Sequence, residues 1–121
     1  MNKISILLLV FALVISCSKN TKKDEKSVEE VSLSAESYMP SDAKLAEKYK
    51  RSCFMCHSNS DAGAPLTKDN SAWQERIDQR GLDGLLKNTI EGYNAMPMKG
   101  QCMDCTEEEL KDLIKFMANL E

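Results

Sequence analysis

The chain has 121 residues, which is the usual size of a single domain. Charged residues make up 29% of it and the formal net charge is −3, so the composition argues against a protein that binds nucleic acid. No segment alternates polar and apolar residues over the length of a strand, whereas several repeat apolar residues at helical spacing. We therefore expect an all-α protein.

Residues 1–16 have the pattern of an export signal. Lys3 precedes an apolar run over residues 4–15, which is too short to span a bilayer. Aliphatic and small residues lead directly into Cys17, as in a bacterial lipobox, where the cysteine is acylated and becomes the mature N-terminus. We predict a signal peptide over 1–16 and lipidation at Cys17, with an ordinary signal peptidase site as the alternative. Either cleavage places the mature protein outside the cytoplasm, on the periplasmic side.

Residues 17–40 mix Lys, Glu and Ser with few apolar residues, which predicts a lipid-anchored flexible linker. The folded domain is then residues 41–121. Its first helix is expected over residues 42–53, capped by Ser41 or Asp42. A short helix is expected with Ser71 as its N-terminal cap, and another from Leu82, ended by Gly92.

The last helix is expected to run to the C-terminus. Thr106 and Glu109 have the spacing of a capping box, and an apolar stripe follows from Leu110. A folded part of this length with so few aromatic residues is marginally stable by itself. We therefore expect a large apolar group in its centre.

Cys53, Cys56 and His57 form the motif C-x-x-C-H, the attachment signature of c-type haem. On a helix the two cysteines lie about one turn apart on one face, so their thiols can reach the two vinyl groups on one edge of the haem. His57 follows directly and can point its imidazole toward the iron. The motif therefore predicts one covalently bound haem c with His57 as a ligand to the iron.

A second pair, Cys102 and Cys105, has the same spacing, so a four-cysteine zinc ribbon is an alternative. Helical patterns fill the sequence between the pairs, where a ribbon uses hairpins, and zinc would leave His57 unused. Thiols of exported proteins are also usually oxidised. The sequence therefore favours haem over zinc.

The second iron ligand cannot be another histidine of this chain, because His57 is the only one. Methionine, lysine, water or an empty position remain, and methionine suits a stable electron carrier because His/Met ligation raises the reduction potential. Five of the seven methionines are set aside by their positions. Met1 lies in the predicted signal peptide, Met39 at the end of the predicted linker, Met55 inside the attachment motif, Met103 between two cysteines, and Met117 on the apolar stripe of the last helix. Met96 and Met98 remain, two apart in an extended, Pro-containing stretch, and spacing alone does not separate them.

Residues 41–120 resemble a class I cytochrome c and, more narrowly, the short bacterial branch called cytochrome c-five. The resemblance is carried by C-x-x-C-H together with "GAP", "AW", "NAMPMKG" and C-x-x-C-[ST]-x-E-E-L. It implies a small monohaem fold in which the N- and C-terminal helices cross, with Tyr49 against Phe116 and the haem in the centre. In that family the ligand methionine immediately precedes a proline, which points to Met96.

The resemblance implies roles for four more residues. The carbonyl of Pro65 would accept a hydrogen bond from His57 Nδ1–H and fix the imidazole, the alternative being a turn proline without that role. Trp73 corresponds to an indole beside the haem propionates, the alternative being packing without a hydrogen bond to them. Cys102 and Cys105 correspond to a disulfide that some members carry, the alternative being a redox-active dithiol.

The sequence therefore predicts a membrane-tethered monohaem cytochrome c that carries single electrons and is not an enzyme. Its partners would be redox proteins: a quinol-oxidising complex or another donor, and a terminal oxidase or reductase. The folded domain would be a monomer. A haem-based sensor or ligand-binding protein with a labile sixth ligand is one alternative, and a fixed haem subunit of a larger redox complex is another.

Overall fold

A computed structural model describes residue 30 and residues 34–120 of the chain. This part contains helices, turns and one isolated β-bridge, and no strand, which confirms the all-α class. No helix within it is long and apolar enough to cross a bilayer. The predicted signal peptide, Cys17 and most of the predicted linker lie outside the described residues. At the end of that linker, Ala35 and Pro40 are buried.

The first helical path is longer than predicted and contains a wide turn. Helix α2 (Ala43–Lys48) is capped by Asp42, whose carboxylate accepts a hydrogen bond of 2.8 Å from Leu45 N. The path continues without a break through a π-helical segment, η1 (Tyr49–Cys53), into α3 (Phe54–His57). Such wide turns often occur at functional sites. Here the turn leads directly into the C-x-x-C-H motif.

Helix α4 (Asn70–Glu91) is bent sharply at Gly81, so it consists of the two helices that the sequence predicts. Gly81 has φ 67° and ψ 171°, a conformation essentially restricted to glycine. The predicted cap at Ser71 is wrong, because Asp69 holds that position and its carboxylate accepts from Ala72 N at 3.1 Å. The helix ends at Gly92, as predicted.

Helix α5 (Glu107–Met117) begins with the predicted capping box of Thr106 and Glu109. It buries an apolar face made of Leu110, Leu113, Ile114, Phe116 and Met117. It ends before the C-terminus, because Asn119 takes a left-handed conformation (φ 58°). Two short 3₁₀ segments, η2 (Ser60–Ala62) and η3 (Met98–Gln101), complete the described elements.

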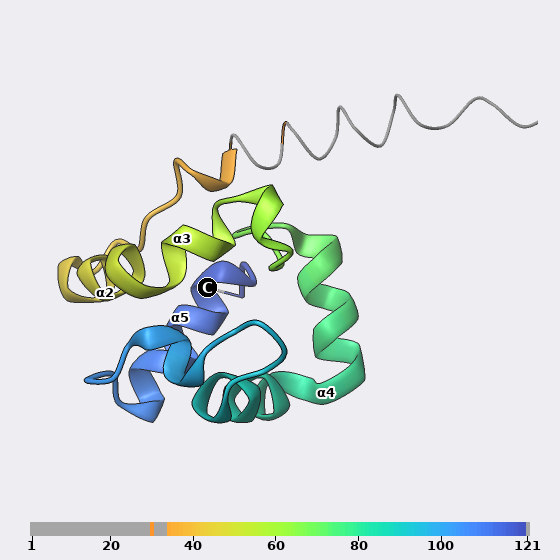
Figure 1. Cartoon of the computed structure of the whole chain (residues 1–121). Coiled ribbons are helices and arrows are strands. Elements are labelled where there is room, and N and C mark those ends of the chain that lie inside the picture. Colours follow the sequence, from red (N-terminus) through yellow and green to blue (C-terminus); the bar gives the residue numbers. More distant parts are fainter. Residues whose placement is uncertain (1–29, 31–33, 121) are drawn as a thin grey trace, which may run out of the picture.

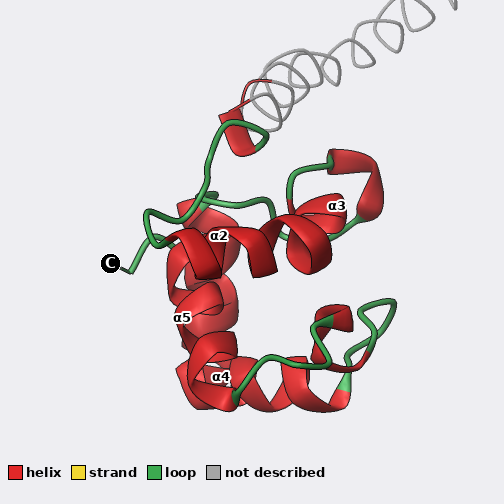
Figure 2. Cartoon of the chain, turned by 90° about the vertical axis from the view of Figure 1, so that its left-hand side faces the viewer, coloured by secondary structure: helices red, strands yellow, loops and turns green. Residues whose placement is uncertain are grey.

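The N- and C-terminal parts of the domain meet through Tyr49. Its ring packs edge-on against Phe116 at 5.1 Å between centroids, and its hydroxyl lies 2.7 Å from the Thr67 hydroxyl. Lys48 Nζ reaches Glu109 at the start of α5, 2.5 Å away. Figure 1 shows α5 in the middle of the domain, and Figure 2 shows it along one side, between α2 above and α4 below. The predicted contact of the first and last helices is therefore confirmed.

Candidate functional site

A cavity of about 490 Å³ lies between the C-x-x-C-H segment and the loop that follows α4. Its volume falls within the range of small-molecule and cofactor sites, roughly 300–1,000 Å³. The wall includes apolar side chains from α4 and α5, among them Leu85, Ile114 and Met117. The cavity is therefore large and apolar enough for a planar cofactor, in the centre of the domain where the sequence predicts one.

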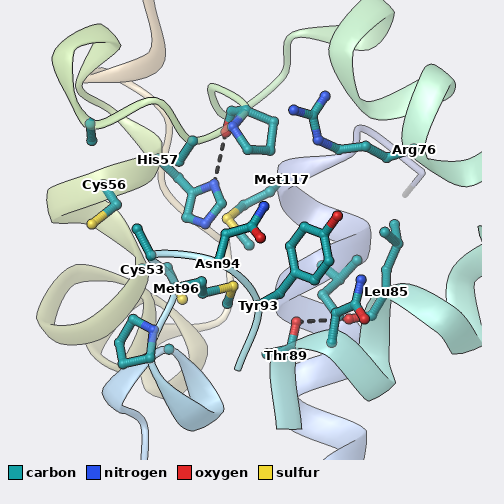
Figure 3. Close-up of a pocket in the computed structure, with 18 of the residues that line it drawn as sticks. Cys53, Cys56, His57, Arg76, Leu85, Thr89, Tyr93, Asn94, Met96 and Met117 are labelled. Atoms are coloured by element: carbon teal, nitrogen blue, oxygen red, sulfur yellow. Dashed lines mark hydrogen bonds between the residues drawn. The ribbon is translucent and has the colours of Figure 1, made fainter. Parts of the chain in front are cut away.

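Cys53 and Cys56 lie together at one side of this cavity (Figure 3). The helical path from η1 into α3 places them about one turn apart. Cys53 is buried and Cys56 is exposed, and both carry free thiols. Burial raises the pKa of the Cys53 thiol to about 11, so this group is uncharged at neutral pH. The two sulfurs border the cavity as attachment to one haem edge requires.

His57 lies at the end of α3, buried, with its ring turned into the cavity. Its Nδ1 is 2.8 Å from the carbonyl oxygen of Pro65. A carbonyl can only accept, so Nδ1 carries the proton and Nε2 keeps its lone pair. Burial lowers the pKa of the imidazole, which favours the neutral form. This is the state in which histidine binds a metal ion.

The segment that contains Pro65 holds His57 at several points. Thr67 N donates to the His57 carbonyl at 2.8 Å, in addition to the bond from Nδ1 to Pro65. The Trp73 ring stacks beside the imidazole, with centroids 5.7 Å apart and planes 25° apart. Its indole N–H donates to the Leu66 carbonyl at 2.8 Å. Trp73 thus lines the cavity, and its N–H donates to the backbone of the segment that holds His57.

The structure separates the two candidate methionine ligands, Met96 and Met98, which their spacing in the sequence could not distinguish. Met96 is half-buried and lines the cavity, whereas Met98 is 55% exposed and does not. Two backbone hydrogen bonds between Tyr93 and Met96, of 2.9 and 3.0 Å, fix the start of the loop. Gly100 packs closely, since a Cβ there would lie 3.3 Å from Met96 Cε. The structure therefore brings Met96 to the same cavity as Cys53, Cys56 and His57 (Figure 3).

The known proteins and the family model that resemble this chain are all cytochromes or cytochrome oxidase subunits. The family model described as cytochrome c oxidase, cbb3-type, subunit III matches residues 40–117. The chain is 49% identical over 69 residues to cytochrome c5 of Ectopseudomonas mendocina, covering 56% of this chain and 79% of that protein. It is 46% identical over 69 residues to cytochrome c5 of Azotobacter vinelandii, covering 56% and 83%. Cytochrome c-555 of Prosthecochloris aestuarii is 30% identical over 79 residues, covering 59% and 79%.

The chain belongs to the class I cytochrome c family. It is a monohaem c-type cytochrome that binds haem c covalently and carries electrons, and it is not an enzyme. The chemistry of the cavity fits this group, because it combines two free thiols, one neutral imidazole and an apolar wall.

In this cytochrome Cys102 and Cys105 form a buried disulfide outside the cavity. Arg51, on η1, donates to the carboxylate of Asp104, whose two oxygens lie 2.6 and 2.7 Å from Arg51 Nη2. Lys99 donates to the Cys105 carbonyl at 3.2 Å from the other side. The disulfide loop is therefore held to the attachment helix and to the loop of Met96. Sequence reasoning found neither Arg51 nor Lys99, because their partners are close only in the folded chain.

The described part of the cytochrome offers no zinc site. Within it, no group of three or more His, Cys, Asp or Glu side chains is arranged to hold a metal ion. Cys102 and Cys105 are bonded to each other, and the other pair borders the cavity. The four-thiol alternative therefore lacks two of its ligands.

Several residues that border the cavity were not predicted from the sequence to belong to the site. They lie in both halves of α4 and just after it: Arg76, Arg80, Leu85, Asn88, Thr89, Tyr93 and Asn94. The one usable signal was the spacing of Arg76 and Arg80, which places both on one face of a helix.

Proposed function

We propose that this cytochrome carries single electrons with an iron bound by His57 and Met96. The observation that supports the proposal is the cavity that these two side chains share with Cys53 and Cys56 (Figure 3). The thiols of Cys53 and Cys56 would form thioethers with the haem vinyl groups, and Nε2 of His57 would bind the iron. Bound haem c supplies an iron that takes up and releases one electron.

The surrounding residues would keep this site unchanged between its two oxidation states. Pro65 fixes the imidazole through Nδ1, and Trp73 stacks beside it. The pair of backbone hydrogen bonds between Tyr93 and Met96 fixes the main chain that carries the Met96 side chain. Because both ligands come from anchored segments in an apolar cavity, little would move when the electron is transferred.

Carbon monoxide binding tests the carrier against a sensor with a labile sixth ligand. The reduced protein is expected to exclude carbon monoxide, because Met96 remains on the iron, and to titrate reversibly as a single one-electron couple. A Met96→Ala variant provides the control, since an open position should bind the gas at once. Rapid carbon monoxide binding by the unmodified protein would favour the sensor.

We also propose that the protein is exported and tethered to the membrane by a lipid. Residues 1–16 would be the signal peptide, Cys17 the lipidated N-terminus, residues 17–40 the linker, and residues 41–121 the cytochrome domain on the periplasmic side. The lipobox-like residues before Cys17 support this arrangement. Replacing Cys17 by Ser should move the haem protein from the membrane to the soluble exported fraction. Retention of the variant in the membrane would contradict lipid anchoring at Cys17.

The proposed partners are redox proteins at the membrane: a quinol-oxidising complex or another donor, and a terminal oxidase or reductase. A net charge of −3 favours a partner with a basic docking face, so electron transfer should slow as salt rises. The family model takes its description from an oxidase subunit, which favours a fixed haem subunit as the second candidate. Purification in mild detergent separates the two: a carrier is recovered as a monomer, and a subunit copurifies with stoichiometric partners.

A further inference from the structure

The chain segment that supplies Met96 is a tight turn on the surface of the domain. Tyr93 and Met96 are joined by a reciprocal pair of backbone hydrogen bonds of 3.0 and 2.9 Å, with Asn94 and Ala95 between them. Met96 is half-buried, and the other three residues of the turn are exposed. Segments with few buried contacts open locally at a low cost in free energy. An iron ligand carried by such a turn therefore needs a restraint to stay in place.

Arg80, at the end of the first half of α4, provides a restraint on this turn. Its Nη2 donates to the Tyr93 hydroxyl at 2.9 Å, and its Cζ lies 5.0 Å from the centre of the Tyr93 ring. A charge-assisted hydrogen bond and a cation–π contact therefore join the two side chains. Among the described residues, no other side chain forms a hydrogen bond to residues 92–98.

The path of α4 brings Arg80 to Tyr93. The two residues are 13 apart in sequence, and the bend at Gly81 lies between them. Gly84, just after the bend, leaves room for the arginine: a Cβ at Gly84 would lie 2.8 Å from Arg80 Cβ, closer than real Cβ atoms approach. Glycine is unfavourable inside a helix compared with alanine, so its presence here fits a need for this close approach.

The contact of Arg80 with Tyr93 acts on the ligand through the backbone. Because Tyr93 and Met96 bond to each other in both directions, a restraint on Tyr93 also restrains the main chain of Met96. We propose that Arg80 and Tyr93 are positioning residues that keep Met96 on the iron by joining its turn to the first half of α4. The inference rests on the proposed ligation by Met96. It explains how an exposed turn can hold the sixth position closed, as a carrier requires.

Imidazole binding to the oxidised holoprotein tests this role, because imidazole takes the sixth position only after the methionine has left. Tyr93→Phe and Arg80→Gln should each tighten imidazole binding by about two- to tenfold, the weight of one hydrogen bond. The double variant should bind no more tightly than the stronger single variant, because both substitutions break the same contact. Gly84→Ala should act in the same direction, since it displaces Arg80 and retains the charge.

Two matched variants separate this role from general effects. Lys87→Gln removes one positive charge from an exposed position on the same helix, and Tyr38→Phe removes the hydroxyl of a tyrosine that is 37% exposed. Neither residue borders the cavity, so both variants should bind imidazole as the unmodified protein does. Urea unfolding reports overall stability in parallel. A lower urea midpoint with unchanged imidazole binding in Tyr93→Phe and Arg80→Gln would make the contact merely structural and refute the positioning role.

Unchanged imidazole affinity in Tyr93→Phe, with the methionine–iron band retained, would overturn the proposal. Effects of Tyr93→Phe and Arg80→Gln that simply add would also overturn it, since Arg80 would then act through a different group. Absence of the methionine–iron band from the unmodified protein would contradict the ligation by Met96 itself, so a failure of the proposed function is distinguishable from a failure of this inference. Should Arg80→Gln fail to fold, Tyr93→Phe and Gly84→Ala decide by the same measurement.

Discussion

Replacing Tyr49 by Phe tests the contact that joins the two ends of the domain. The substitution keeps the ring against Phe116 and removes the hydroxyl that lies 2.7 Å from Thr67 Oγ1. Both side chains are fully buried, so the Thr67 hydroxyl would lose its described partner away from water. Leaving one buried hydroxyl unpaired costs about 1–3 kcal/mol. With a denaturant slope of about 1–2 kcal/mol/M, a loss of about 2 kcal/mol lowers the urea midpoint by roughly 1–2 M.

A double-mutant cycle separates the hydrogen bond from packing. Thr67→Val keeps the shape of the side chain and should cost about as much as Tyr49→Phe, because it leaves the Tyr49 hydroxyl unpaired. The double variant removes both polar groups together and should be far less destabilised than the sum of the two, by about 0.5–3 kcal/mol. Urea unfolding of the oxidised holoproteins measures all four. Simple additivity would refute the reasoning that the two hydroxyls satisfy each other.

Three further changes follow from the same structure. Burial raises the pKa of Tyr49 above its usual value of 10.0. The stability that the neutral side chain contributes is therefore complete below pH 10 and is lost as the pH rises through the folded-state pKa. Tyr49→Phe should flatten this alkaline loss of stability, and equal slopes of the unfolding free energy against pH for the two proteins would contradict the expectation. Gly81→Ala should lower the free energy of unfolding by about 1–3 kcal/mol, because φ 67° and ψ 171° suit glycine alone. A Cβ there would meet no neighbouring atom, so the cost is backbone strain without a steric clash. An unchanged urea midpoint would show that the bend is not maintained. Replacing Cys102 and Cys105 by Ser should lower the free energy of unfolding by ~2 kcal/mol, the chain-entropy value for so small a loop. A change near zero in chemical unfolding would show that Arg51 and Lys99 hold the loop without the disulfide.

Local rules predicted most of the fold. The capping box of Thr106 and Glu109 and the break near Gly81 both follow from neighbours in sequence, so their positions were found without tertiary information. The cap of α4 was assigned to Ser71 rather than Asp69, because both types favour that position and the sequence does not say which backbone N–H is free. The π-helical turn before Cys53 had no sequence signal at all.

The site was less predictable than the fold, because most of its contacts join distant segments. The C-x-x-C-H motif identifies three site residues by their spacing alone. Met96 and Met98 could not be told apart in this way, because only the folded loop determines which of the two side chains lines the cavity. The hydrogen bond from the Trp73 N–H to the Leu66 carbonyl was not predicted, because only the chain path after His57 brings these two groups close. The arginines of α4 carried a helical spacing and no sign of what they face.

The measurement that tests the central claim most directly is the visible spectrum of the oxidised exported protein, compared with its Met96→Ala and Met98→Ala variants. Met96 lines the cavity and Met98 is largely exposed, so the two substitutions remove the same side chain from different sides of the loop. We expect the methionine–iron charge-transfer band to disappear in Met96→Ala and to persist in Met98→Ala, with covalent haem in both. Loss of the band in Met98→Ala, with the band retained in Met96→Ala, would contradict the proposed ligation.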